Sequence, residues 1–167
     1  IMSLLIRPAM PEDCATIAYI EKLCFSSTEA APLESIRERQ KLFTHTFLVA
    51  CLDTTIVGFI NGCVTQQPHI TDDLFHSTAL HDDQAPTQMV FSLAVHPEYQ
   101  HQGIAVRLMH AFIEIARMNK KKRLTLTCKK ERIPFYEQFG YINEGLAQST
   151  HGGSTWYNMT IDFPENQ

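Results

Sequence analysis

The alternation of apolar and polar residues predicts a chain of short strands and amphipathic helices. Two runs rich in β-branched and aromatic residues, Thr46 to Leu52 and Thr55 to Val64, flank Asp53-Thr54 and predict an antiparallel hairpin. Gly58 and Gly62 interrupt the second run. Glycines inside a strand pattern indicate a bulge or the close approach of another backbone.

Three longer segments are predicted to be helices, and two of them have the apolar spacing of an amphipathic helix. The first begins at Pro11-Glu12-Asp13, and its predicted apolar stripe is Ile17, Ile20, Leu23 and Cys24. The second runs from about Leu33 to Phe43, and its mixed charge is typical of a surface helix. The third has the most regular apolar positions, which are Ala105, Leu108, Met109, Phe112, Ile113 and Ala116.

Further strands are predicted at Leu4 to Arg7, Gln88 to Val95, Leu124 to Cys128, Tyr141 to Leu146 and Thr155 to Ile161. A short helix from Ile133 to Phe139 ends at Gly140, and Gly152-Gly153 predicts a tight turn between the last two strands. The order β, α, α, β, β, β, α, β, α, β, β contains no repeat or linker. It predicts a mixed α/β sheet in a single domain over residues 1–167.

The segment from Thr65 to Thr87 has no sustained periodicity and is too long for an ordinary connection. It contains three histidines, four aspartates and two prolines. Such a segment is either a mobile lid or a binding loop. Its aspartates would attract a cationic ligand or simply form a charged, solvated loop.

Composition narrows the class of protein. The 167 residues are 44% hydrophobic and 19% charged, which is ordinary for a folded domain. A net charge of −4 argues against nucleic-acid binding, and no segment has the about 20 apolar residues of a membrane span. Five cysteines without a Cys-x-x-Cys pair or a zinc-ligand spacing predict reduced thiols, no metal and a cytoplasmic location.

The stretch from Gln100 to Ala105 carries the clearest chemistry, because it enters the most regular helix. Unpaired backbone N–H groups at a helix N-terminus bind a pyrophosphate, and Gly103 would let the backbone approach it. The spacing is neither the lysine loop of ATP-binding proteins nor the glycine fingerprint of dinucleotide-binding proteins. One glycine before a helix is equally typical of an ordinary turn.

Three motifs in order remove that ambiguity. They are Ser92-Leu93-Ala94-Val95-His96-Pro97, Gln100-x-x-Gly103-x-Ala105 and Ile133-Pro134-Phe135-Tyr136-x-x-Phe139-Gly140-Tyr141. Together they resemble the GNAT superfamily of N-acetyltransferases, and within it the arylalkylamine N-acetyltransferase branch and its bacterial relatives. The resemblance covers nearly the whole chain, since it also includes Arg7-Pro8, Phe25, Pro32-Leu33, Gly58-Phe59-Ile60 and Trp156.

The resemblance implies a GNAT fold, a central and mostly antiparallel sheet flanked by helices, with acetyl-coenzyme A (acetyl-CoA) as cosubstrate. The strand ending near Val95 would bulge and splay from the Leu124 to Cys128 strand. The pantetheine arm would enter that gap beside Leu93, Ala94 and Val95. Gln100 stands where the family often has Arg or Gln, and the pyrophosphate would lie on the amides of His101, Gln102, Gly103, Ile104, Ala105 and Val106.

The resemblance also assigns Tyr136 as the general acid that protonates the coenzyme A thiolate, although aromatic packing between Phe135 and Phe139 is the alternative. The branch uses two histidines as its proton relay, and this chain has Met89 and Phe91 at those positions. The general base is therefore not identified. Other histidines, each with a plain structural alternative, are His69, His76, His81, His96 and His151.

The expected activity is transfer of the acetyl group to a primary amine, a small arylalkylamine or polyamine-like molecule. Two alternatives share the fold: a peptide or protein N-terminal acetyltransferase, and a non-catalytic acyl-CoA sensor that lost its base. The sequence does not specify the amine, because acceptor pockets are built from variable loops. A homodimer would form if the closing strand near Trp156 paired with a second subunit.

Overall fold

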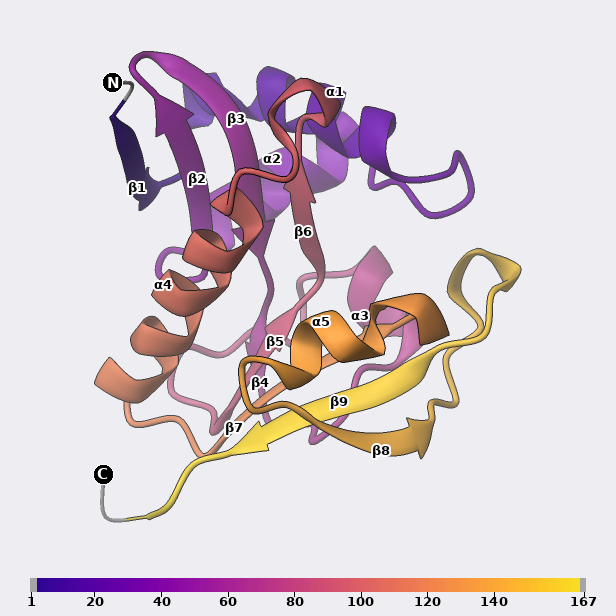
Figure 1. The fold of residues 1–167 in the computed structure, drawn as a ribbon. Coiled ribbons are helices and arrows are strands. Elements are labelled where there is room, and N and C mark those ends of the chain that lie inside the picture. Colours follow the sequence, from indigo (N-terminus) through magenta and orange to yellow (C-terminus); the bar gives the residue numbers. More distant parts are fainter. Residues whose placement is uncertain (1–2, 166–167) are drawn as a thin grey trace.

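The computed structural model describes residues 3–165 and contains two sheets with helices on both faces (Figure 1). The strands are β1 (Leu4–Pro8), β2 (Phe47–Leu52), β3 (Thr55–Asn61), β4 (Val64–Thr65), β5 (Thr87–Val90), β6 (Ser92–Val95), β7 (Arg123–Cys128), β8 (Ile142–Leu146) and β9 (Tyr157–Asp162). The helices are α1 (Cys14–Cys24), α2 (Leu33–Leu42), α3 (Asp72–His76), α4 (Ile104–Met118) and α5 (Ile133–Glu137). Short 3-10 turns span Pro11–Asp13, Pro97–Tyr99, Lys130–Arg132 and His151–Gly153.

The strands are ordered β1-β2-β3-β6 in one sheet and β4-β5-β7-β9-β8 in the other. All pairs are antiparallel except β5 with β7. The predicted mixed α/β, mostly antiparallel architecture is therefore confirmed. The hairpin predicted around Asp53-Thr54 is also confirmed as β2 and β3.

Two runs that the sequence predicts as single strands are each divided between the sheets. Gln88 to Val95 breaks at Phe91, whose N–H donates to the carbonyl of Asn61 at 2.7 Å, while Ser92 is the strand partner of that same Asn61. Two residues opposite one make a β-bulge, which bends the strand and carries it from β5 into β6. Thr55 to Val64 divides in the same way into β3 and β4.

Both glycines of the β3 run lie against another backbone, as their position predicts. A Cβ atom on Gly58 would lie 2.9 Å from the carbonyl oxygen of Ala94, and one on Gly62 would lie 1.6 Å from that of Met89. Only glycine allows strands to approach this closely. The two contacts tie β3 to β6 and to β5 on either side of the bulge.

Helix α4 covers one face of the first sheet and buries most of the predicted stripe. Ala105 is only partly buried, whereas its neighbour Ile104 is buried. Helices α1 and α2 cover the opposite face, around Ile17, Ile20 and Ile36. The predicted stripe of α1 was wrong at Leu23, which is 43% exposed. The buried positions of α1 include Glu21 instead, and α2 buries Arg39 among its charged residues.

The segment from Thr65 to Thr87 forms a packed cover over the end of this face. It contains α3, and its buried residues are Ile70, Leu74 and Ala85. The segment is therefore fixed to the core in this structure through its apolar residues. No helix within residues 3–165 has the length and apolar character needed to cross a membrane, and the five cysteines are free thiols.

The C-terminal strands differ from the expected hairpin. Gly152 and Gly153 lie in the His151–Gly153 turn, which is one part of a longer connection between β8 and β9. Strand β9 is paired on both sides, with β7 and with β8, so it offers no free edge to a second subunit. The expectation that the strand near Trp156 pairs between subunits was wrong, because β8 is the edge strand.

Candidate active site

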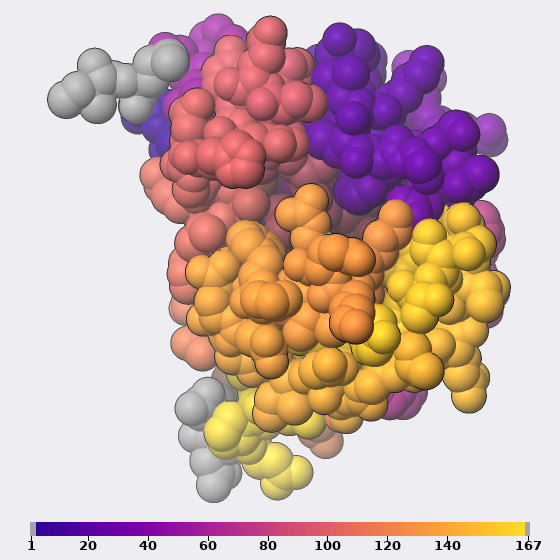
Figure 2. All heavy atoms as spheres, turned by 45° about the vertical axis from the view of Figure 1, so that its right-hand side comes forward, coloured from indigo at the N-terminus to yellow at the C-terminus, as the bar shows by residue number. Residues whose placement is uncertain are grey.

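The two sheets part between β6 and β7. Strand β5 pairs with β7 as far as Val90 and Leu126, whereas β6 pairs only with β3. Thr127 and Cys128 at the end of β7 therefore have a strand partner only in β9. A gap opens between β6 and this end of β7, and Figure 2 shows the surface hollowed where the indigo and pink half meets the orange half. The predicted splay is confirmed.

Strand β6 turns part of its backbone toward the gap. His96 donates to the carbonyl of Val57 at 2.8 Å, and alternation in an antiparallel pair then directs the N–H and C=O of Leu93 and Val95 away from β3. The Val95 carbonyl accepts from Gln100 Nε2 at 2.9 Å and lies 3.2 Å from the Cys24 thiol. The backbone of Ala94 faces β3 by the same alternation.

The loop before α4 has the backbone shape of an anion site. His101 and Gly103 both have positive φ angles, 65° and 83°, and Gly103 is the N-cap of α4 without any side-chain cap. The first intrahelical bond of this turn is from Arg107 N–H to the Gly103 carbonyl at 3.1 Å. The preceding amides thus have no partner in the helix, and the helix dipole adds positive potential there.

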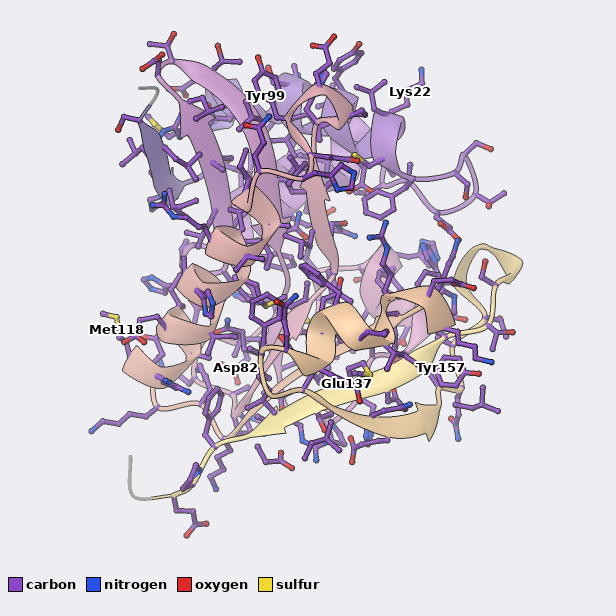
Figure 3. All side chains as sticks on the ribbon, in the orientation of Figure 1. Lys22, Asp82, Tyr99, Met118, Glu137 and Tyr157 are labelled. Atoms are coloured by element: carbon purple, nitrogen blue, oxygen red, sulfur yellow. The ribbon has the colours of Figure 1, made fainter. Side chains whose placement is uncertain are left out.

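These features fit a pyrophosphate. A Cβ atom on Gly103 would meet nothing within 4 Å, so the glycine is explained by its left-handed backbone and not by a close contact. Figure 3 labels Tyr99 just before this loop and Met118 at the far end of the same helix. The gap beside β6 and the uncapped end of α4 are separated only by the short Pro97–Tyr99 turn and the loop that follows it.

Tyr136 lies on α5 beside the end of β7. Its ring packs edge-on against Phe135 and Tyr141, with centroid distances of 5.1 and 5.8 Å. Phe135 contacts Phe139 directly, so Tyr136 does not lie between those two rings. Within residues 3–165 no group hydrogen-bonds its hydroxyl. Burial, and then the nearby Cys128, raise the pKa of Tyr136, so the phenol is protonated at neutral pH.

Three of the candidate histidines have structural contacts. His96 Nδ1 accepts from the N–H of Glu98 at 3.1 Å and caps the Pro97–Tyr99 turn. His81 Nδ1 accepts from Val64 N–H at 3.0 Å, and His69 lies 3.3 Å from Glu144. None of these three rings contacts Met89 or Phe91.

His151 is the exception, and of its two sequence interpretations, a place beside the acceptor site or plain polar surface, its contacts favour the first. Its ring stacks on Phe75 at 4.5 Å, and Phe75 lies 5.1 Å from Phe91. Its Nε2 lies 3.2 Å from the Glu29 carbonyl, to which it donates. The fold thus brings His151, from the β8–β9 connection, close to Phe91 through Phe75. Phe91 is one of the two positions at which the arylalkylamine branch has a histidine.

Glu21 of α1 is the functional candidate that the sequence analysis missed. It is 2% exposed, and its Oε2 accepts from Ala31 N–H at 3.1 Å. Ile17 and Ile20 lie on the buried face of α1. Glu21 lies on the same face, because it is four residues after Ile17. A carboxylate inside an apolar stripe was therefore the available signal.

Loops of the α1–α2 and β8–β9 connections contact one another on the side of the bulge opposite α4, which we call the acceptor side. The Glu29 carboxylate pairs with Lys129 at 2.8 Å and accepts from Ser154 at 3.1 Å, which joins the α1–α2 connection to the β8–β9 connection. Asp72 of α3 accepts from Ser149 in the same connection, and this hydrogen bond lowers the pKa of Asp72. Of the four predicted loop aspartates, Asp72 therefore has a structural role.

The remaining loop aspartates are exposed and make local hydrogen bonds. Asp73, Asp82 and Asp83 bond to Thr71, to the N–H of Gln84 and to His81 respectively. Within residues 3–165 no three His, Cys, Asp or Glu side chains are grouped so that they could hold a metal ion.

Comparison with known proteins identifies the same architecture. A family model described as the acetyltransferase (GNAT) family matches residues 14–141. Serotonin N-acetyltransferase of Mesocricetus auratus is 27% identical over 157 residues, which are 92% of this chain and 74% of that protein. The human serotonin N-acetyltransferase is 26% identical over the same shares of both chains.

Solved structures share the fold at low identity. The loading GNATL domain of CurA from Lyngbya majuscula superposes with a TM-score of 0.82 at 17% identity, over 96% of this chain and 98% of that chain. The protein yncA from Salmonella typhimurium, solved with its cofactor acetyl-CoA, has a TM-score of 0.70 at 17% identity, over 98% and 95%.

Proposed function

This chain belongs to the acetyltransferase (GNAT) family, and we propose that it transfers the acetyl group of acetyl-CoA to the primary amine of a small molecule. One observation carries the proposal. The gap between β6 and β7 opens beside the uncapped N-terminus of α4, so a single extended ligand can place a diphosphate on the amides and a thioester in the gap.

The cosubstrate would be held mainly by backbone groups. The pantetheine amides would pair with Leu93 and with the N–H of Val95, while the pyrophosphate would accept from the amides between His101 and Val106. Gln100 would act indirectly, because its side chain fixes the Val95 carbonyl at the edge of the gap. Acetyl-CoA supplies a thioester whose carbonyl carbon an amine attacks.

Tyr136 would be the general acid. Its hydroxyl is protonated at neutral pH and makes no hydrogen bond with residues 3–165, so it is free to donate. A phenol can give its proton to the thiolate as the carbon–sulfur bond breaks, which prevents the thiolate from attacking the new amide. Its position next to Cys128, at the open end of β7, supports this role.

The acceptor would be a small amine. The contacts of Glu29 with Lys129 and Ser154 close the acceptor side with short loops, whereas an N-terminal acetyltransferase needs an open groove for an extended peptide. The aromatic rings of Phe75, Phe91 and Trp156 and the similarity to serotonin N-acetyltransferase favour an arylalkylamine. Free buried thiols favour a cytoplasmic location.

Two measurements test the proposal. Calorimetry with acetyl-CoA and with coenzyme A should show binding of both, and a thiol-release assay over arylalkylamines, polyamines and peptides should show turnover on small amines. Absence of binding would overturn the proposal. Binding without turnover on any acceptor would support an acyl-CoA sensor, and turnover on peptides alone would support a peptide acetyltransferase.

A further inference from the structure

The buried carboxylate of Glu21 has one oxygen with a hydrogen bond and one without. Oε2 accepts from Ala31 N–H at 3.1 Å, whereas Oε1 is fully buried and has no hydrogen-bond partner within residues 3–165. A buried carboxylate oxygen without a donor is unfavourable, because the interior does not replace the hydrogen bonds that water would make. An N–H or O–H group of a ligand would satisfy this oxygen.

The surroundings of Glu21 place this oxygen on the acceptor side of the bulge. The Ser92 hydroxyl lies beside the carboxylate and favours its charged form. Ser92 is the first residue after the bulge and pairs with Asn61, whose Nδ2 is also buried without a hydrogen-bond partner within residues 3–165. Two unpartnered polar atoms thus belong to the polar cluster beneath the point where the sheets separate.

Arg39 balances the charge of this cluster without occupying the carboxylate. Its guanidinium donates to Asn61 Oδ1 at 3.4 Å and to the Phe75 carbonyl at 3.3 Å, and stacks on Phe91 at 5.1 Å. Glu21 is in none of the ion pairs within 4.0 Å among residues 3–165. Oε1 therefore has no partner among residues 3–165, and it lies on the side of the sheet opposite the face that α4 covers.

We propose that Glu21 is the general base of the transfer, and that its Oε1 takes a proton from the ammonium group of the acceptor at the bulge. This inference rests on the function proposed above. Glu21 would accept the proton that Met89 and Phe91, which replace the two histidines of the branch, cannot accept. The carboxylate accepts one ammonium proton, and the neutral nitrogen then forms a bond to the thioester carbon. The carbon–sulfur bond breaks and the thiolate takes a proton from Tyr136. The second proton lost by nitrogen passes to solvent, from which the Tyr136 phenolate regains a proton.

The surroundings of Glu21 make its carboxylate more basic than an exposed one. Burial raises the pKa of Glu21, and this shift is opposed by the Ala31 hydrogen bond, the nearby Ser92 hydroxyl and the charges of Arg39 and His151. Within α1, the charge of Glu21 contributes to raising the pKa of the Cys24 thiol, after burial. A carboxylate with a raised pKa is a stronger base, and general bases are most effective when their pKa lies near the working pH.

The test compares Glu21→Gln with Glu34→Gln, an exposed glutamate of α2, between about pH 5.5 and about 9.5, a span that lies between the ordinary pKa of a carboxylate and that of an amine. Gln keeps an oxygen for Ala31. At pH 7 we expect kcat/KM for an arylalkylamine to fall about 100-fold or more in Glu21→Gln, with the Kd for acetyl-CoA within twofold. The deficit should shrink at high pH, where free amine is abundant. The acidic limb, which is the bend in the pH profile of the wild type caused by protonation of the base, should be absent in Glu21→Gln. Glu34→Gln should match the wild type.

A structural role would give a different result. An equal loss at every pH, or an unchanged pH profile in Glu21→Gln, would overturn the assignment. So would loss of the acidic limb in His151→Gln but not in Glu21→Gln, because His151 would then be the base. Wild-type protein that binds acetyl-CoA but acetylates no amine would overturn the proposed function together with this role.

If Glu21→Gln does not fold, Glu21→Asp provides the test, because it keeps the carboxylate and withdraws the oxygens by one methylene. We expect kcat to fall about tenfold or more with the acidic limb retained and with unchanged binding of acetyl-CoA. An unchanged kcat would show that the position of Oε1 does not matter and would overturn the proposal.

Discussion

Gly62 lies so close to Met89 that a Cβ atom at position 62 would be 1.6 Å from the Met89 carbonyl oxygen. This contact joins the end of β3 to β5 next to the bulge, so it holds the two sheets together where they begin to separate. We expect Gly62→Ala to lower the free energy of unfolding by at least about 3 kcal/mol, because backbone must move to admit the methyl group.

Urea denaturation and thermal unfolding measure this loss, which corresponds to a decrease in Tm of about 10 °C. The control is Gly145→Ala on the edge strand β8, where a Cβ would meet nothing within 4 Å and only the positive φ of 96° costs energy. Equal losses in the two variants would contradict the proposed role of the Gly62–Met89 contact.

Tyr136→Phe tests the general acid. Its hydroxyl has no hydrogen-bond partner within residues 3–165, so its removal should leave stability nearly unchanged. We expect kcat to fall about 100-fold while the Kd for acetyl-CoA stays the same, because only proton donation is lost. Tyr141→Phe is the matched control, since the Tyr141 hydroxyl contacts Met109 Sδ at 3.4 Å in the core. Equal turnover by Tyr136→Phe and wild type would remove Tyr136 from the mechanism.

Gly103→Ala and Gly153→Ala form a matched pair for the phosphate loop. Their φ angles are 83° and 76°, and neither Cβ would meet an atom within 4 Å. Each substitution should cost about 1 kcal/mol through the left-handed backbone. Only Gly103→Ala should weaken acetyl-CoA binding, by about tenfold in calorimetry, because it disturbs the amides that hold the diphosphate. Similar affinities in both variants would argue against this loop as the diphosphate site.

The ion pair between Asp13 and Arg7 predicts a loss of stability in acid. Arg7 donates to both oxygens of the Asp13 carboxylate, at 2.7 and 3.1 Å. Burial disfavours the charged carboxylate, but the hydrogen bonds from Arg7 and Met10 outweigh it and hold the pKa of Asp13 below 3.8. The folded pKa is thus the lower one, so the stabilisation is complete above 3.8 and is lost as pH falls through the folded pKa.

Asp13→Asn should therefore lose about 2 kcal/mol of stability at pH 7 and progressively less than that, relative to wild type, below pH 4. Urea denaturation between pH 7 and about 2.5 measures the difference. Glu12→Gln, an exposed change in the same turn, is the control and should follow the wild type. A pH-independent difference between Asp13→Asn and wild type would show that the charge of Asp13 is not the cause.

Local patterns predicted most of the elements, but not the short helix α3 in the segment from Thr65 to Thr87. The apolar spacing of α4 and the glycine before it predicted both the helix and its uncapped end, because these depend on residues within a few turns of one another. The motif around Tyr136 likewise predicted its place on a short helix. The acceptor side could not be read in this way, since Glu21 and His151 are 130 positions apart in the chain.

The sequence by itself determined most of the order of elements, the glycine at the start of α4 and the family resemblance, because periodicity, turn residues and short motifs are encoded locally. Only the tertiary structure decided that the run through Phe91 divides between two sheets and that Glu21 lies buried beneath the division. A bulge arises from how the Asn61 carbonyl pairs across strands, and burial of a carboxylate depends on what packs against it. Both are properties of distant residues brought together, which no local pattern contains.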